Sequence, residues 1–175
     1  MAVDVNAQNG LKEVMRVFPQ GVTVVTTTGP DGPCGITVSA FTSISVTPPL
    51  IMISISKQSS FYAPLMESKQ FAVNLLADDQ KSVSDRFAGR HDVSNRFEGI
   101  GYGQGVTGMP IIWGVRAFVE CRTWKVHDGG DHSLILGEVV RAGKLNDKQP
   151  LVFYGQTYTT TERVELASPP QETMW

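Results

Sequence analysis

The chain has 175 residues, of which 41% are hydrophobic and 18% charged, and its formal net charge is −2. This length and composition predict one globular domain with a hydrophobic core, and the small net charge gives no reason to expect nucleic acid or an anionic membrane as a partner. No apolar stretch approaches the ~18 residues of a transmembrane helix. Residues 1–10 lack the basic and then apolar pattern of a signal peptide, so a cytoplasmic location is expected.

The pattern along the chain predicts many short strands and few helices. Apolar residues recur at helical spacing between Asn9, a good N-cap, and Pro19, which ends the segment. Strands are predicted over residues 22–28, 34–45, 50–56, 71–76, 115–127, 132–142, 151–154 and 157–160, with further short helices over 61–68 and 78–87. Residues 89–110 are expected to form an irregular loop. This pattern predicts an antiparallel β-barrel with helical decorations, as a single domain over 1–175 with its core at about 11–160 and a tail at 161–175.

The segment from Gly35 to Pro64 carries most of the functional information. Its first strand alternates small hydroxyl side chains with apolar ones, and a strand with so little bulk lets a flat ligand with polar edges lie close to its backbone. The pair Ser59-Ser60 follows Lys57 where a short helix is predicted to begin, a position that favours an anion. Together these features predict a site for a phosphorylated planar ligand, and FMN fits that description.

A cluster of hydroxyls and a cation is the predicted phosphate site: Ser54, Ser56, Lys57, Ser59 and Ser60. A strand end, an N-cap serine and a solvated lysine explain the same residues without a ligand. Arg86 and Arg90, near the end of the next helix, are either further phosphate partners or surface charge.

Two other motifs have alternative explanations. Residues 103–108 match GxGxxG, but neither a strand before them nor a helix after them is predicted, so a flexible loop is expected in place of a dinucleotide site. The cluster His127, Asp128, Asp131 and His132 is either a metal site or the turn of a hairpin. A third possibility is that His132 points into a cleft as a polar contact. Cys34 and Cys121 lie far apart in no CxxC pattern and are expected to be small buried hydrophobes.

Six blocks of sequence occur in a fixed order. They are FPQGVTVVTT from Phe18, GITVSAFTSISVTPPL from Gly35, FAVNLLADDQ from Phe71, RFAG from Arg86, GDHSLILGEV from Gly130 and PLVFYGQTY from Pro150. Over residues 11–158 the chain therefore resembles the short-chain flavin reductases, the reductase components of two-component flavin-dependent monooxygenases such as the 4-hydroxyphenylacetate 3-monooxygenase reductase.

The resemblance implies a mainly β fold, an FMN-binding split β-barrel that is antiparallel and Greek-key-like with a few short helices. It implies a homodimer with flavin at or near the interface, oxidation of NADH or NADPH, and release of reduced FMN or FAD to a partner monooxygenase. The implied flavin-binding residues are Thr37, Val38, Ser39, Ala40, Ser54, Ile55, Ser56, Lys57, Ser59, Ser60, Phe87, Ala88 and Arg90. His132 and Tyr158 are the implied NAD(P)H contacts, and Asn74 and Gln80 match family positions to which no contact is assigned.

No catalytic side chain and no metal are expected, because direct hydride transfer between two stacked rings needs orientation but no acid or base from the protein. Two alternatives stay open at this point. One is a flavin-binding protein that stores or senses flavin without turnover. The other is a ferric reductase on the same scaffold, for which the His127–His132 cluster is the only indication.

Overall fold

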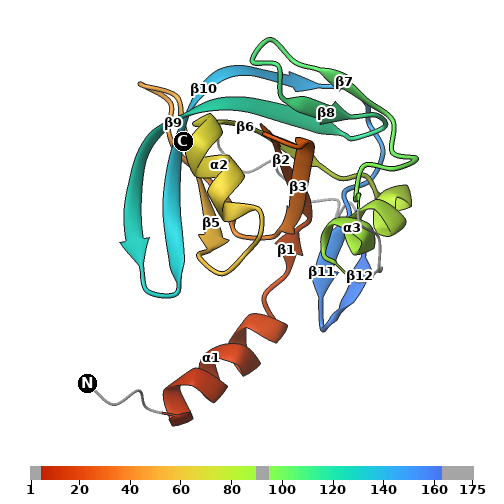
Figure 1. Ribbon diagram of the computed structural model, residues 1–175. Coiled ribbons are helices and arrows are strands. Elements are labelled where there is room, and N and C mark those ends of the chain that lie inside the picture. Colours follow the sequence, from red (N-terminus) through yellow and green to blue (C-terminus); the bar gives the residue numbers. More distant parts are fainter. Residues whose placement is uncertain (1–4, 90–94, 163–175) are drawn as a thin grey trace.

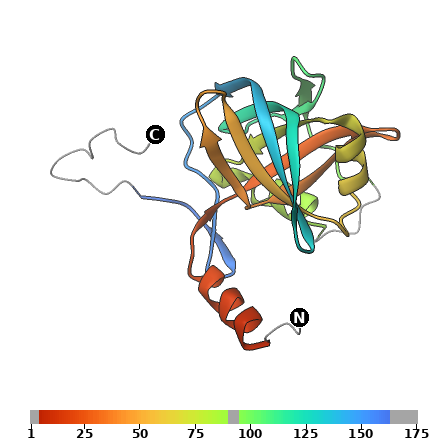
Figure 2. The same ribbon diagram turned by 90° about the vertical axis from the view of Figure 1, so that its left-hand side faces the viewer.

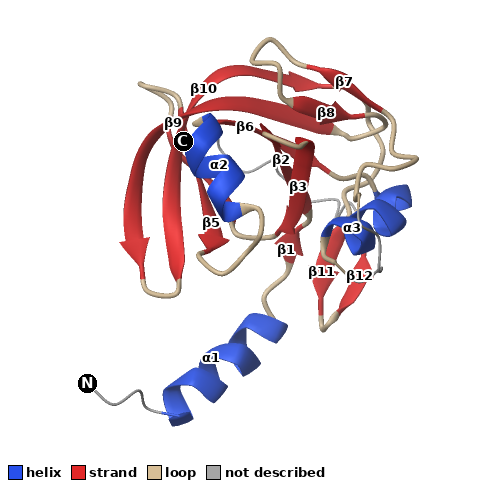
Figure 3. Ribbon diagram, viewed as in Figure 1, coloured by secondary structure: helices blue, strands red, loops and turns tan. Residues whose placement is uncertain are grey.

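The computed structural model describes residues 5–89 and 95–162. Its helices are α1 (Val5–Arg16), α2 (Tyr62–Ser68) and α3 (Lys81–Phe87), the last preceded by the 3₁₀ turn η1 (Asp78–Gln80). Its strands are β1 (Gln20–Gly21), β2 (Thr23–Gly29), β3 (Gly32–Val38), β4 (Phe41–Ser45), β5 (Leu50–Ser56), β6 (Gln70–Leu75), β7 (Tyr102–Gln104), β8 (Pro110–Ile112), β9 (Ala117–Gly129), β10 (His132–Lys144), β11 (Val152–Tyr154) and β12 (Thr157–Thr159). Strands dominate the described residues (Figure 3), which confirms the predicted mainly β fold.

Seven antiparallel strands form one curved sheet, in the order β3-β2-β6-β9-β10-β5-β4. The sheet curls around the core as a barrel (Figure 1). Its two edge strands, β3 and β4, are consecutive in the chain and are separated by only Ser39 and Ala40. The chain itself connects the two edges, and the main-chain bond from Ser54 N to Ala40 O (3.1 Å) holds the connection against β5. The predicted barrel is therefore split between β3 and β4.

The barrel wall separates two apolar clusters. In β5 the alternate residues Ile51, Ile53 and Ile55 are buried in the cluster inside the barrel, as the period-2 pattern of a strand requires. Neighbouring residues of β2 face opposite ways: Val25 packs inside, whereas Val24 packs in the outer cluster beneath α3 and β8. The outer cluster fixes the elements that surround the split.

Two predicted elements differ from those observed near the N-terminal end. The helix begins at Val5, so Asn9 lies inside α1 and does not cap it. Residues 5–8 contain no proline, so nothing in their sequence prevents the helix from beginning before Asn9. The predicted strand over 34–45 is two strands, because its two halves pair at opposite edges of the sheet, β3 with β2 and β4 with β5.

The predicted irregular loop over 89–110 contains the strand β7 and reaches the start of β8. Buried polar groups of the sheet anchor this hairpin: Pro110 O accepts bonds from Thr26 Oγ1 (2.6 Å) and Asn74 Nδ2 (3.4 Å), and Ile112 N donates to Asn74 Oδ1 (2.9 Å). These anchors come from β2 and β6, far away in the sequence, and local pattern alone does not reveal them.

The GxGxxG motif forms the turn between β7 and β8. Thr107 donates to the buried Glu120 Oε1 through both N (2.9 Å) and Oγ1 (2.7 Å). A Cβ on Gly105 would lie 2.0 Å from that same oxygen, so only glycine fits. The turn is bonded to the sheet, which corrects the expectation of a flexible loop and gives the glycines a packing role.

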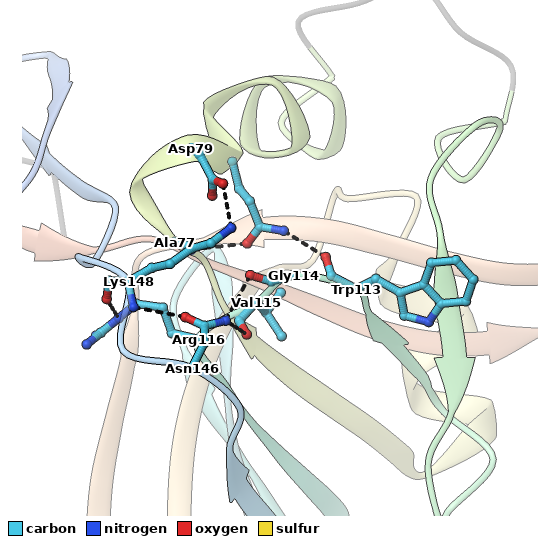
Figure 4. A network of polar contacts seen from close by, with 9 residues as sticks. Ala77, Asp79, Trp113, Gly114, Val115, Arg116, Asn146 and Lys148 are labelled. Atoms are coloured by element: carbon cyan, nitrogen blue, oxygen red, sulfur yellow. Dashed lines mark hydrogen bonds and ion pairs between the residues drawn. The ribbon is translucent and has the colours of Figure 1, made fainter.

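A polar network fixes the start of α3 (Figure 4). Gln80 accepts from Ala77 N (3.0 Å) and donates to Trp113 O (2.9 Å). Lys148 Nζ reaches Asp79 Oδ2 (2.6 Å), and Asn146 Nδ2 donates to Val115 O (2.9 Å). The network joins α3 to the segments that precede β9 and β11, so the helix has a defined place beside β3.

A first prediction concerns Gly137 in β10. An added Cβ would lie 2.5 Å from Phe71 Cζ and 2.9 Å from Cys121 Cβ, inside the barrel core. Overpacking of this kind costs about 1–3 kcal/mol, which lowers the Tm of a chain this size by roughly 3–10 °C. Calorimetry of Gly137→Ala should show that loss. Gly21→Ala is the matched control, because no atom lies within 4 Å of its added Cβ. Equal Tm values for the two variants would contradict the packing argument.

Candidate functional site

One group of predicted site residues meets between β3 and α3. Thr37, Ser39, Ala88 and Tyr158 line a cavity of about 150 Å³, together with Val22, Ser84 and Phe153. Thr37 Oγ1 donates to Ser84 O (2.6 Å), which ties the edge strand to the helix. The structure thus brings together the predicted flavin segment and one of the two predicted nicotinamide contacts.

Tyr158 is held by several contacts. Its hydroxyl donates to Asp85 Oδ1 (3.0 Å) and lies 2.9 Å from Ser84 Oγ. Its ring packs edge-on against Phe153 at 5.4 Å between centroids, and Lys81 Nζ lies 5.9 Å from the ring centre. The aromatic wall of the cavity is therefore fixed before any ligand binds.

Three of the predicted flavin contacts have buried side chains. Val38 and Ile55 belong to the core inside the barrel, and Phe87 lies in the outer cluster. Only their main chains can face a ligand. Phe87 still shapes the site, because a Cβ on Gly35 would lie 2.9 Å from its ring, so β3 runs close to α3 at that point.

A second group of predicted residues meets where β5 ends beside the turn between β9 and β10. Ser54 pairs with Leu134, and Ser56 pairs with His132, so the serines and the histidine share one face of the sheet. His132 Nδ1 lies 2.8 Å from Asp131 Oδ1. Since a carboxylate only accepts, Nδ1 is the donor, and Nε2 remains for a ligand.

Lys57 is ion-paired with Asp128 and donates to Gly130 O (2.7 Å). The hydrogen bond and charge of Lys57 lower the pKa of Asp128 below its ordinary value of 3.8. The hydrogen bond from His132 likewise lowers the pKa of Asp131. Both carboxylates are therefore ionised near neutral pH and already have cationic or donor partners. Over residues 5–89 and 95–162 no three His, Cys, Asp or Glu side chains are grouped to hold a metal ion.

The helix after Lys57 begins one residue later than predicted, so Ser59 and Ser60 lie just before its N-cap and neither of them caps it. Helix α2 begins at Tyr62 with Phe61 as N-cap, and it has only seven residues. Ser56 Oγ accepts from Gln58 N (3.3 Å), and Ser59 Oγ accepts from Phe61 N (3.2 Å). These hydroxyls form local turns, and their hydrogens remain available to an anion.

Ser60 lines a cavity of about 440 Å³ beside the turn between β2 and β3. Arg96 lies in the same cavity and was not singled out from the sequence. Its Nη1 donates to Gly35 O (3.2 Å) and Phe87 O (2.9 Å), so the guanidinium is fixed at the edge of β3. No local motif marks Arg96, because its contacts come from residues 9 and 61 positions away. Arg90 lies outside the described residues, and Arg86 donates to Glu98 O.

Strand β3 connects the two cavities. Gly35 lines the larger one, and Thr37 and Ser39 line the smaller one. As an edge strand it has one row of main-chain groups without a neighbouring strand. Small side chains, hydroxyls and an arginine along an open edge fit a flat ligand with polar edges and an anionic tail. His132 is not among the residues that line these two cavities.

Cys34 lines the larger cavity, whereas Cys121 lies in the barrel core. Burial raises the pKa of Cys121 to about 12 and also raises the pKa of Cys34. Both thiols are therefore protonated near neutral pH and are poor nucleophiles. Cys121 is buried in the barrel core as expected, whereas Cys34 is half-buried against it.

Comparisons with known proteins identify a family for this chain. A family model described as "Flavin reductase like domain" matches residues 15–162. The chain is 40% identical over 147 residues to FMN reductase (NADH) SmoA of Agrobacterium fabrum, covering 84% of this chain and 82% of that one. Nitrilotriacetate monooxygenase component B of Mycobacterium thermoresistibile has a TM-score of 0.88 at 31% identity, covering 97% and 96% of the two chains. NADH:FAD oxidoreductase SgcE6 of Streptomyces globisporus, in complex with NAD and FAD fragments, has a TM-score of 0.81 at 32% identity, covering 97% and 99%.

No helix among the described residues has the length and apolar character that crossing a membrane requires.

Proposed function

The chain belongs to the flavin reductase-like family, and we propose that it binds flavin along the open edge of β3 and passes the reduced form to a separate monooxygenase. Its activity is that of an NAD(P)H-dependent flavin reductase, with FMN or FAD and a nicotinamide nucleotide as ligands. When bound, the flavin supplies the redox chemistry by accepting a hydride from the nicotinamide. Because the reaction consumes NAD(P)H, we propose that the protein is cytoplasmic.

The observation that carries the proposal is the edge strand β3, which runs between two cavities and has small or hydroxyl-bearing residues along it. Thr37 Oγ1 donates its hydrogen bond to Ser84 O, so the lone pairs of Oγ1 remain to accept a bond from a ring N–H. Ser39 and Ala40 bring main-chain groups to the split with little side-chain bulk. These residues would hold the polar edge of the flavin ring.

The anionic end of the flavin fits the larger cavity. Ser60 and the fixed guanidinium of Arg96 line it together, and an arginine with remaining N–H groups is a strong phosphate partner. Lys57 stays a predicted phosphate partner, with Ser54, Ser56 and Ser59 beside it. Its ammonium would then be shared with Asp128, which is mostly exposed to water and can give up the pair at little cost.

His132 and Tyr158 have different roles in this proposal. Tyr158 forms a rigid wall of the smaller cavity, against which a nicotinamide ring can rest. His132, held by Asp131, offers Nε2 at the start of β10 to an amide or a phosphate of the nucleotide. We also propose a homodimer with flavin close to the interface. Tyr158 lines the smaller cavity and His132 does not, so a second copy of the chain would bring both side chains to one nucleotide.

The proposed activity is tested by mixing protein, FMN and NADH and following the nicotinamide absorbance. Consumption of NADH that requires both protein and flavin supports a reductase. Flavin binding without NADH consumption would support a storage or sensing protein. NADH consumption that requires ferric iron as the electron acceptor, with flavin present only in catalytic amount, would support a ferric reductase.

The next prediction concerns the flavin phosphate. A charge-assisted hydrogen bond contributes ~1.5–3 kcal/mol, or roughly ten- to a hundredfold in affinity. Lys57→Ala and Arg96→Gln, each measured by calorimetric titration, should therefore weaken FMN by that factor and leave riboflavin, which has no phosphate, nearly unchanged. Asp128→Asn is the matched control, since it frees Lys57 and should not weaken FMN. Equal losses of affinity for FMN and riboflavin would contradict the assignment of the substituted residue to the flavin phosphate.

A further prediction concerns His132. His132→Ala should raise the apparent KM for NAD(P)H and slow flavin reduction, because a contact to the nucleotide is lost. FMN affinity should stay within about threefold, since that contact does not belong to the flavin. Stopped-flow reduction and equilibrium FMN binding measure the two effects separately. Loss of FMN with unchanged nucleotide kinetics would contradict the role.

A further inference from the structure

A separate cavity of about 310 Å³ lies between the β7–β8 hairpin and the strands β9 and β10. In two perpendicular views this hairpin is at the end of the barrel opposite α1 (Figures 1 and 2). Among the residues that the structure describes, none that lines this cavity also lines either cavity of the proposed flavin site. Small-molecule pockets have volumes of roughly 300–1,000 Å³, so the cavity is large enough for a small ligand that the proposed function does not use.

Trp113 forms an aromatic wall of this cavity. Its main chain is fixed on both sides, because Trp113 N donates to Gly101 O (2.9 Å) and Trp113 O accepts from Gln80 Nε2 (2.9 Å). The indole extends away from that polar network (Figure 4) and packs on Gly101, where an added Cβ would lie 2.3 Å from Cε3 of the ring. Trp113 is nevertheless 69% exposed. An exposed indole that is already held in place offers a rigid surface on which a second ring can stack.

Arg141 supplies the positive charge of the cavity. It lies opposite Glu120 across β10 and β9, and its Cζ is 5.7 Å from the centre of the Phe118 ring. Within residues 5–89 and 95–162 its guanidinium has no hydrogen-bond or ion-pair partner. Its N–H donors therefore remain for an anion, and a carboxylate is the anion that an arginine binds through two parallel hydrogen bonds.

Glu120 is a buried carboxylate in the cavity lining. Its Oε1 accepts two bonds from Thr107, which hold the turn of the hairpin. Its Oε2 is also buried and has no hydrogen-bond partner among the described residues. Buried polar atoms are nearly always bonded, so this acceptor points to a ligand that brings a hydroxyl group into the cavity.

We propose that this cavity binds a hydroxylated aromatic carboxylate. The ring of the ligand stacks on Trp113, its carboxylate pairs with Arg141, and its hydroxyl donates to Glu120 Oε2. An aliphatic acid lacks the stacking, and an aromatic alcohol leaves Arg141 without its anion. A cationic ligand is excluded by the charge of Arg141. The site is separate from the open edge of β3 and does not depend on the reductase activity.

The first test is an NMR titration of the full-length protein with 4-hydroxybenzoate. The chain has three tryptophans, and the indole N–H signal of Trp113 is the one that Trp113→Ala removes. We expect this signal to shift saturably while the signal of Trp124 stays in place, with the same affinity in the presence of saturating FMN. No saturable shift at millimolar acid, or loss of the shift when FMN is added, would overturn the proposal. A Trp113 signal that moves with protein concentration alone would also overturn it, because a second copy would then cover the cavity.

The second test compares ligands that each lack one group. Loss of the carboxylate, in 4-hydroxybenzyl alcohol, should weaken binding roughly ten- to a hundredfold, the effect of one charge-assisted hydrogen bond. Loss of the aromatic ring, in 4-hydroxycyclohexanecarboxylate, should weaken it roughly two- to tenfold. Equal affinities for the three compounds would overturn the assigned ligand class.

The third test is calorimetric titration of exposed-residue variants, in which the fold is retained. Arg141→Gln should weaken 4-hydroxybenzoate roughly tenfold or more, and Trp113→Ala should weaken it roughly two- to tenfold. The matched controls are Arg122→Gln and Trp124→Ala, which change exposed residues of β9 outside the cavity and should leave the affinity unchanged. Unchanged affinity in the two cavity variants, or equal losses in the controls, would overturn the site.

The contact with Glu120 is tested by Glu120→Gln, which keeps one acceptor oxygen for Thr107 and replaces the other oxygen with an amide donor. The variant should weaken 4-hydroxybenzoate and leave benzoate, which has no hydroxyl, nearly unchanged. Equal effects on the two acids would overturn the role of Glu120. If this variant does not fold, the preference of the wild type for 4-hydroxybenzoate over benzoate decides the same point, and no preference would overturn the role.

Discussion

The break between β3 and β4 is the constraint on which the rest of the structure depends. A seven-stranded sheet with a normal twist curls until its edges approach each other, and here the two edges are successive pieces of one chain. Ser39 and Ala40 occupy the junction, and the bond from Ser54 N to Ala40 O holds it. The barrel can therefore enclose a complete apolar core while leaving a row of main-chain groups on β3 without a strand partner.

That open edge needs rigid surroundings if it is to bind a ligand. Thr37 bonds to α3 through Ser84 O, Tyr158 bonds to Ser84 and Asp85, and Arg96 bonds to Gly35 and Phe87. The start of α3 is in turn fixed by Gln80 and the segments around it. Most of these contacts join residues that are distant in sequence, so the site depends on several segments at once.

The sequence predicts the fold well wherever the signal is local. The strand over 50–56 has the predicted bounds because its alternation of isoleucine with half-exposed residues is regular. The family resemblance and the small residues of β3 also predict a flavin segment, which stays a prediction. The pairing of Lys57 with Asp128 and the anchoring of the β7–β8 hairpin depend on which segments are neighbours across the sheet. Arg96 is placed by its bonds to Gly35 and Phe87. Periodicity along one segment does not reveal these partners. Asn74 illustrates the limit: it matches a family position, yet it is fully buried and bonded within the structure.

In the proposed function, an edge strand also allows flavin to bind and then leave. Main-chain groups on an interior strand are bonded to neighbouring strands on both sides and would have to break those bonds before binding anything. One side of β3 has no strand partner, so its main-chain groups there can exchange water for a ligand without breaking the sheet. A flat ligand with polar edges replaces that water, and its departure restores it, so neither state leaves buried polar groups unpaired. The walls formed by Tyr158 and Phe87 are held by contacts that do not involve the ligand, and the barrel need not open. A reductase that passes its reduced flavin to another protein requires this combination of a fixed shape and an accessible edge.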